Sequence, residues 1–95
     1  MEFAWDERKN RANQRKHRLT FETAILVFDD PFHVSVHDRE LEIDGELEAR
    51  WQTIGMAGTQ VLLVGHTVDE EAGVIRILTA RKATRRERSI YAQTI

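Results

Sequence analysis

The chain of 95 residues contains no cysteine, one proline and only five glycines. Without cysteine it can form no disulfide and no thiolate metal site, which suits a reducing cytosol. No apolar run approaches the roughly 18 residues of a membrane span, and the stretch MEFAWDERKNR lacks the apolar segment of a signal peptide. We therefore expect one domain over residues 1–95, located in the cytoplasm and not in a membrane.

Two common catalytic motifs are also missing. The sequence has no glycine-rich phosphate loop and no histidine pair with HExxH spacing. His33 and His37 lie on one expected strand, about 13 Å apart from end to end, which is too far for a single metal ion. We therefore interpret both histidines as surface residues, and we expect no metal and no cofactor.

Positive charge is scarce in the middle of the chain and concentrated at its two ends. Residues 1–20 carry six Lys or Arg against three Asp or Glu, and residues 76–95 carry six against one. Residues 21–75 carry two against twelve, so the net charge of −2 hides a segregated distribution. If the two ends meet in space they form one basic surface, and the acidic middle offers a separate face to a basic partner. The alternative is that both are ordinary solvated faces.

Hydrophobic periodicity and capping residues predict an α+β fold with a single, antiparallel-rich sheet and the order β-α-α-β-β-β-β-α. The expected strands cover residues 2–5, 32–38, 50–56, 60–68 and 74–79. The expected helices run from Asp6 to His17, from Thr20 to Phe28, and onward from Thr84. The apolar run Val61 to Val64 predicts a central strand. Residues 39–48 are acidic and contain a glycine, and we interpret them as a mobile connection.

The last expected strand runs without a turn signal into a basic helix, over residues 74–88. Arg76 and Arg81 interrupt its apolar residues, and Glu87 stands three residues after Thr84, the spacing of a capping box. Guanidinium groups bind phosphate oxygens in a planar, bidentate manner, so this segment suits a polyanion such as nucleic acid.

The first expected helix is unusually polar, since Ala12 is its only small apolar residue. Four of its side chains share one face at i, i+4, i+7 and i+8: Lys9, Asn13, Lys16 and His17. We expect this face to complete the basic surface of residues 74–88. The alternative is an ordinary solvated helix face.

His66 and Arg76 are the most informative polar residues of the expected strands. Their strands are consecutive, so the two residues should be neighbours and could face the same side of the sheet. An unpaired guanidinium in a core costs several kcal/mol. Arg76 therefore either pairs with an internal carboxylate such as Glu22 or opens onto a cleft that binds an anion. Three aromatic side chains are assigned to the core rather than to base stacking: Phe3, Trp5 and Trp51.

Five runs, in this order and at this spacing, resemble the BrnT toxins of type II toxin–antitoxin modules: FAWDERKNRANQRKH, TFETAILVFDDP, RWQTIGMAG, VLLVGHT and IRILTARKATRRER. The resemblance implies a RelE-like fold of the RelE/ParE superfamily and a metal-independent endoribonuclease that blocks translation. It also implies a BrnA-type ribbon-helix-helix antitoxin, dimeric in a heterotetramer, through which the complex reaches operator DNA and represses its own operon. One position departs from the family, which commonly has glycine after the Lys-His pair, whereas Arg18 stands here.

Metal-free cleavage of RNA requires a base for the 2′-OH, cations for the phosphorane and an acid for the leaving 5′-oxygen. Guided by the resemblance, we assign phosphate stabilisation to Arg76 and Arg81. Proton transfer is assigned to three candidates without choosing between base and acid: Lys16, His17 and His66. Further RNA contacts are assigned to six residues: Lys9, Asn13, Arg50, Lys82, Arg85 and Arg86. Two alternatives from other classes are a non-catalytic module that binds an antitoxin and a nucleic-acid-binding module without chemistry.

Overall fold

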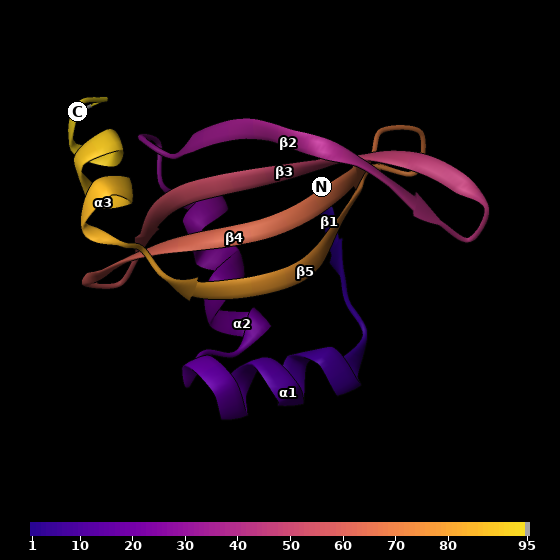
Figure 1. Ribbon diagram of the computed structural model, residues 1–95, viewed down its shortest axis with the longest axis horizontal. Helices are drawn as coiled ribbons and strands as arrows, with labels where there is room; N and C mark the ends of the chain where they lie inside the picture. The colour runs from indigo at the N-terminus through magenta and orange to yellow at the C-terminus, as the bar shows by residue number, and fades with distance from the viewer. Residues whose placement is uncertain (95) are drawn as a thin grey trace.

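The computed structural model describes residues 1–94 and shows one five-stranded sheet accompanied by short helices (Figure 1). The helices are α1 (Glu7–His17), α2 (Phe21–Ala24), the 3₁₀ helix η1 (Ile25–Asp29) and α3 (Arg85–Ala92). The strands are β1 (Glu2–Ala4), β2 (Val34–Ile43), β3 (Glu46–Ala57), β4 (Gln60–Asp69) and β5 (Val74–Lys82). The sheet order is β1-β5-β4-β3-β2, with β1 parallel to β5 and the other neighbours antiparallel. The predicted α+β class is confirmed, and β4 is the central strand as expected.

The helices begin where their capping residues predicted. The Asp6 carboxylate accepts a hydrogen bond from the backbone N–H of Arg8, and the Thr20 hydroxyl accepts one from the N–H of Thr23. Thr84 and Glu87 form both hydrogen bonds of a capping box at the start of α3. No helix within residues 1–94 is long and apolar enough to cross a membrane.

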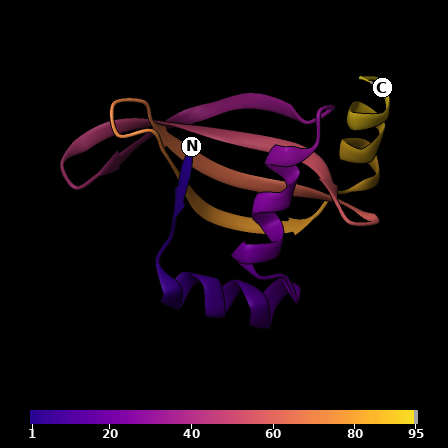
Figure 2. The same ribbon diagram turned by 180° about the vertical axis from the view of Figure 1, so that it is seen from behind.

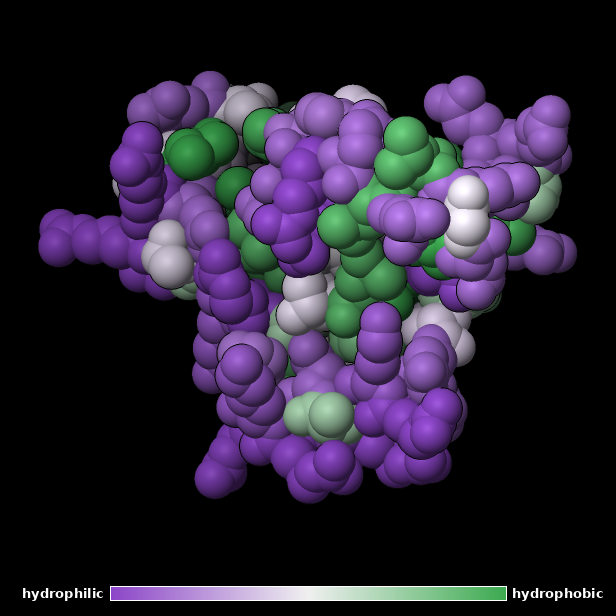
Figure 3. All heavy atoms as spheres, turned by 45° about the vertical axis from the view of Figure 1, so that its right-hand side comes forward, coloured by the Kyte–Doolittle hydropathy of each residue, from purple (hydrophilic) through white to green (hydrophobic). Residues whose placement is uncertain are grey.

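Two buried asparagines, rather than an apolar stripe, attach the polar helix α1 to the rest of the protein. The Asn10 side chain accepts a hydrogen bond from Phe21 N at 2.8 Å and donates to Glu22 Oε1 at 2.7 Å. The Asn13 amide donates to Leu19 O and Ala80 O, both at 2.9 Å, and accepts from Ala80 N at 3.1 Å. The remaining polar side chains of α1 are thus free to face solvent, as the hydrophilic lower part of Figure 3 shows.

The main core lies on the face of the sheet that α2 and η1 cover, which is turned toward the viewer in Figure 2. Phe21 and Val27 from the helices are completely buried against Val64 and Ile77 of the sheet. At Gly55 the helix and sheet backbones approach so closely that a Cβ would lie 3.0 Å from Val27 Cβ. Burial of these apolar surfaces is the main source of stability for a domain of this size.

The opposite face of the sheet, called here the open face, is covered only at one end by α3 (Figure 1). There Tyr91 packs on Ile54 and Leu63, and its hydroxyl donates a hydrogen bond to the Asp30 carboxylate. Arg76 lies between two core residues, Ile75 and Ile77, so the alternation along β5 directs it to the open face.

Residues 39–48 do not form a mobile connection, and that prediction was wrong. They form the outer part of a β2–β3 hairpin that extends beyond the rest of the sheet (Figure 1). Its turn consists of Asp44 and Gly45, both with positive φ, at 51° and 80°. This is the backbone geometry of a two-residue type I′ turn, for which Asp-Gly is a favoured pair.

Arg18, the C-cap of α1, stands at the position where the resemblance described above led us to expect glycine. Arg18 adopts the left-handed conformation, with φ 57° and ψ 32°, and its N–H bonds to Gln14 O at 2.8 Å. The chain therefore makes the expected turn without the glycine, at a conformational cost of about 1–2 kcal/mol.

A candidate active site on the open face of the sheet

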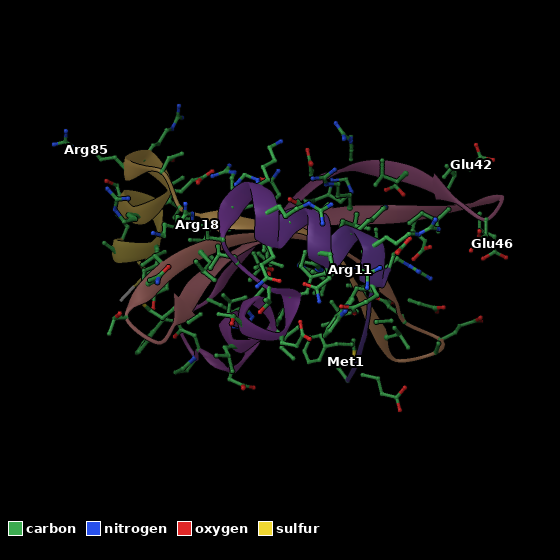
Figure 4. The ribbon with its side chains drawn as sticks, turned by 90° about the horizontal axis from the view of Figure 1, so that it is seen from below. Met1, Arg11, Arg18, Glu42, Glu46 and Arg85 are labelled. Carbon is green, nitrogen blue, oxygen red and sulfur yellow. The ribbon has the colours of Figure 1, made fainter. Side chains whose placement is uncertain are left out.

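A cleft of about 460 Å³ lies where the open face meets the β2–β3 hairpin and the first turn of α1. Three basic residues from three different elements line it: Lys9, Arg50 and Arg76. Three acidic residues also line it: Asp6, Glu42 and Asp44. Figure 4 shows Glu42 toward the outer end of the hairpin, at the opposite end of the molecule from Arg85.

At the base of this cleft a row of side chains crosses three neighbouring strands. Arg50 of β3 is the cross-strand partner of Thr67 of β4, and Thr67 is the partner of Arg76 of β5. Within residues 1–94, Thr67 Oγ1 and Arg76 Nε are buried and lack hydrogen-bond partners, whereas the buried Arg50 Nε lies in an ion pair, 3.4 Å from Asp38 Oδ2. A buried donor without a partner costs about 1–3 kcal/mol, and more when it is charged. We call Arg50, Thr67 and Arg76 the arginine row. At Thr67 and Arg76 it contains buried polar atoms for which residues 1–94 provide no hydrogen-bond partner.

Two states were predicted for Arg76: an ion pair with an internal carboxylate, or a position that opens onto a cleft. Arg76 has no carboxylate partner among residues 1–94, and it opens onto the cleft instead of pairing with Glu22. The Glu22 carboxylate accepts a hydrogen bond from Asn10.

The Arg50 guanidinium lies between the Asp38 carboxylate and the backbone of Gly65. Its Nε lies 3.4 Å from Asp38 Oδ2, an ion pair across β2 and β3. A Cβ on Gly65 would lie only 3.0 Å from Arg50 Nη2, so the guanidinium rests directly over this glycine. Thr79 Cγ2, 2.8 Å from the same point, encloses the position further. The absence of a side chain at Gly65 thus allows Arg50 to lie flat on the open face.

A shallower groove of about 220 Å³ continues along α1 and shares Lys9 and Thr79 with the cleft. Lys16 and His17, the two candidates for proton transfer from α1, line this groove and do not line the cleft of Arg76. Asn13 also lines the groove, but its amide is occupied by the hydrogen bonds that tie α1 to β5. The assignment of Asn13 to RNA contact is corrected, because both of its donor hydrogens are used within the protein.

Arg81 lies in an ion pair rather than in the cleft. Its guanidinium donates to both oxygens of Glu87, at 2.7 and 2.9 Å, and connects the end of β5 to the first turn of α3. These hydrogen bonds raise the pKa of Arg81 and lower the pKa of Glu87. A guanidinium satisfied in this way supports α3, and we no longer place it beside Arg76.

Three further predicted RNA contacts lie at or near the α3 end of the molecule: Lys82, Arg85 and Arg86. Lys82 is exposed at the end of β5, and Arg85 begins α3. Arg86 lines a separate groove of about 250 Å³ between α3 and the sheet, with Val36 and Ile90. None of the three lines the cleft of Arg76.

His66 lies on the covered face, so the expectation that it shares a side with Arg76 was wrong. Its cross-strand partner is the core residue Ile77, whereas Arg76 pairs with Thr67. Only 3% of His66 is exposed, and its Nε2 lies 2.7 Å from Thr53 Oγ1. Burial, with a smaller effect of His33, lowers the pKa of His66 to about 4. The side chain is therefore neutral at pH 7 and separated from the arginine row by the sheet.

A comparison with protein families identifies the family of the chain. The profile of one family matches residues 5–87 and is described as the ribonuclease toxin BrnT of type II toxin–antitoxin systems. The chain belongs to the BrnT family. The match covers the elements from α1 to the start of α3, and so includes every residue that lines the cleft. A search of curated proteins gave no match.

Membership of the BrnT family confirms the resemblance found in the sequence and makes RNA the substrate class of the toxins to which this chain is related. Sequence reasoning had missed several residues that line the cleft: Asp6, Leu41, Glu42, Asp44 and Thr79. It had also missed the buried Thr67 between Arg50 and Arg76. The Asp-Gly pair at residues 44 and 45 was the available signal, because it predicts a hairpin that carries acidic side chains back toward the sheet. No signal identified Thr67, whose importance depends on the cross-strand register.

The cleft and the adjoining groove are lined by cationic and titratable side chains from several elements. Within residues 1–94 no cluster of three or more His, Asp or Glu side chains has the spacing to hold a metal ion. The cleft presents the cationic side chains of Lys9, Arg50 and Arg76, and the adjoining groove presents Lys16 and His17.

Proposed function

We propose that this protein is a metal-independent endoribonuclease that cleaves RNA in the cleft of Arg76 and thereby inhibits translation. The observation that carries the proposal is the arginine row, in which the buried Thr67 Oγ1 and Arg76 Nε lack hydrogen-bond partners among residues 1–94. A phosphate oxygen is an acceptor that would satisfy them, and guanidinium groups are well suited to it. The family match supports RNA as the source of that phosphate.

In the proposed reaction the 2′-oxygen of RNA attacks the adjacent phosphorus atom while a base removes its proton. Arg76 and Arg50 stabilise the negative charge that accumulates on the non-bridging oxygens of the phosphorane. An acid donates a proton to the departing 5′-oxygen, which leaves a 2′,3′-cyclic phosphate and a 5′-hydroxyl. Lys16 and His17, on the groove beside Thr79, supply the base and the acid.

The partner we propose is a BrnA-type antitoxin with a ribbon-helix-helix domain. Two copies of each chain would form a heterotetramer, bind operator DNA through the antitoxin and repress the operon. The description of the family as part of type II toxin–antitoxin systems supports a protein antitoxin. We further propose that the protein acts in the cytoplasm, where its RNA substrate and translation take place.

The decisive experiment is cleavage of a labelled single-stranded RNA by the purified protein in the presence of EDTA. We expect cleavage that ends in a 2′,3′-cyclic phosphate, and a loss of about 100-fold or more in Arg76→Ala. Arg11→Ala is the matched control, because Arg11 is an exposed arginine of α1 that does not line the cleft. Circular dichroism and thermal unfolding show whether each variant folds.

Three results would contradict the proposal in different ways. Full cleavage by Arg76→Ala would remove the arginine row from the site. RNA that is bound but not cut, by the free protein with or without Mg²⁺, would favour a nucleic-acid-binding module. Tight binding to an antitoxin without any affinity for RNA would favour the non-catalytic partner.

The assignment of base and acid has its own test. An RNA with sulfur in place of the leaving 5′-oxygen needs no acid, because a thiolate departs without protonation. The variant that lacks the acid should cleave this substrate at nearly the wild-type rate, and the variant that lacks the base should not. We would compare His17→Ala with Lys16→Met; rescue of neither would exclude both residues as the acid.

A further inference from the structure

A second pocket, of about 310 Å³, lies on the covered face of the sheet, behind the arginine row. It is lined by Phe28, His33, Ser35, Trp51, His66, Val68, Glu70 and Ile75. Arg50 and Trp51 are adjacent on β3, and Ile75 and Arg76 are adjacent on β5, so the cleft and this pocket lie back to back. The ribonuclease reaction described above leaves the pocket without a role.

The walls of the pocket are aromatic and held in place by edge-on contacts. The Trp51 ring is half-buried and meets His37 edge-on, with centroids 5.2 Å apart at 84°. Phe28 meets His66 in the same way, at 5.0 Å and 83°. A pre-ordered indole beside an open volume is a suitable surface for stacking a flat ring.

The inner wall of the pocket contains a polar atom that lacks a hydrogen-bond partner within residues 1–94. The Thr53 hydroxyl holds His66 by its Nε2, at 2.7 Å, and is itself hydrogen-bonded to the Ser35 hydroxyl at 2.7 Å. His66 Nδ1 is buried and has no partner within residues 1–94. Because His66 is 97% buried and lines the pocket, a polar atom of a ligand is what would satisfy Nδ1.

The rim of the pocket supplies one carboxylate, from the exposed Glu70. A carboxylate only accepts hydrogen bonds, and its two oxygens match two adjacent N–H donors. Among the four RNA bases only guanine presents such a pair, on N1 and N2. Guanine also has ring and carbonyl acceptors on its other edge for a donor such as His66 Nδ1–H.

We propose that this pocket binds one guanine base, stacked on Trp51 and held by Glu70 and His66. The proposal goes beyond the proposed function, and it requires no cleavage in the cleft. The base could belong to an RNA strand or to a free guanine nucleotide, because the pocket contacts are to the base alone.

Binding is tested on the wild-type protein labelled with ¹⁵N-histidine, by titration with GMP, AMP, CMP and UMP. With GMP we expect the resonances of His66 and His33 to shift and those of His17 to stay unchanged. The other three nucleotides should bind at least about ten-fold more weakly. Glu70→Gln should weaken GMP by about ten-fold, whereas Glu71→Gln, its neighbour in the same turn, should leave binding unchanged.

Cleavage assays on RNAs with and without guanine near the cut distinguish a base within an RNA strand from a free guanine nucleotide. If the base comes from RNA, Glu70→Gln loses the preference for guanine and keeps its cleavage of other sequences. If it comes from a free nucleotide, GMP binds and the cleavage pattern of the variant does not change. Arg76→Ala should keep GMP binding, so failure of the proposed cleavage site would not be mistaken for failure of this pocket.

Two outcomes would overturn the proposal. One is the absence of His66 shifts at millimolar GMP. The same result is expected if the pocket accepts only an aromatic side chain of an antitoxin and no free base. The other is equal binding of all four nucleotides that Glu70→Gln does not change.

Discussion

The position of one guanidinium depends on the smallest residue of the sheet. Gly65 lies under Arg50, and any larger residue would bring its Cβ within 3.0 Å of Arg50 Nη2. The same Cβ would meet Thr79 Cγ2 at 2.8 Å. A glycine in the interior of a strand lowers stability, because it loses more conformational entropy on folding than other residues. Here it leaves space for an arginine side chain.

Gly65→Ala should therefore lower kcat/KM for RNA cleavage by about ten- to hundred-fold, because it displaces Arg50 from the arginine row. Thr79→Ser removes the second close contact, so the double variant Gly65→Ala/Thr79→Ser isolates the contact with Arg50. Thr79→Ser alone is the control and should remain close to wild type. Wild-type cleavage by the double variant would show that the position of Arg50 does not matter.

His66 should make stability depend on pH in a defined window. Its pKa is about 4 in the folded protein and 6.5 as a free side chain. Between these values the unfolded chain binds more protons, so the free energy of unfolding falls as pH falls from 6.5 toward 4. The loss from this residue amounts to at most about 3 kcal/mol.

Urea unfolding at pH 7 and at pH 4.5 would measure this loss, with His66→Gln as the comparison. The glutamine amide can still bond to Thr53 but does not titrate, so the variant should lose less stability on acidification. Carboxylates such as Glu87, whose pKa is lowered, affect both proteins alike. An identical loss in both proteins would rule out His66 as the cause.

Among the elements, α1 shows how a helix without an apolar stripe can still be fixed. Asn10 and Asn13 bind backbone groups of α2 and β5, so hydrogen bonds perform the role that burial performs elsewhere. The groove side of the helix is then free for Lys9, Lys16 and His17. Arg18, which directly follows the helix, is held in a conformation that glycine adopts more readily.

Replacing Arg18 by glycine should stabilise the protein by about 1 kcal/mol, because it relieves the left-handed conformation at the end of α1. Arg11→Gly is the matched control in the exposed interior of the same helix, and it should destabilise by about 1 kcal/mol. Thermal unfolding of the two variants gives the comparison. A lower melting temperature for Arg18→Gly would mean that the arginine side chain stabilises the turn.

The elements also show what the sequence could and could not predict. Helix starts followed from local capping residues such as Asp6 and Thr84, whose partners lie within three positions. The faces of His66 and Arg76 did not, because a shift of one residue in register reverses a side chain's face and the β4–β5 pairing shifts after Gly65. Arg81 looked like a second phosphate ligand because nothing local showed that α3 folds back to place Glu87 beside it.

At the scale of the whole molecule, net charge is a poor guide to the partner. The total is −2, yet the cleft brings together Lys9 and Arg76, which lie far apart in the sequence, with Arg50 from the acidic middle. The two basic ends meet as β5 and α1, joined by Asn13 and Ala80. Local potential, rather than total charge, attracts a polyanion.

Binding of a non-cleavable 2′-methoxy RNA should weaken with salt, because phosphate contacts release counterions. Three contacts by Lys9, Arg50 and Arg76 predict a slope of log K against log salt of about −2 for a single strand. Arg76→Ala should reduce this slope by about 0.7, and Arg11→Ala should leave it unchanged. A flat salt response in the wild type, measured by fluorescence anisotropy, would exclude phosphate contacts.

The parallel pairing of β1 with β5 also limits when the sheet can be completed during synthesis of the chain. Residues 2–4 are synthesised 72 positions before their partners, residues 74–76. At roughly 5–20 residues per second, the first strand waits several seconds for its neighbour. The strand that completes the sheet is the one that carries Arg76, so the arginine row cannot exist on a ribosome-bound fragment that stops before β5. A toxin with this topology cannot assemble its proposed active site until β5 has been synthesised and has left the ribosome.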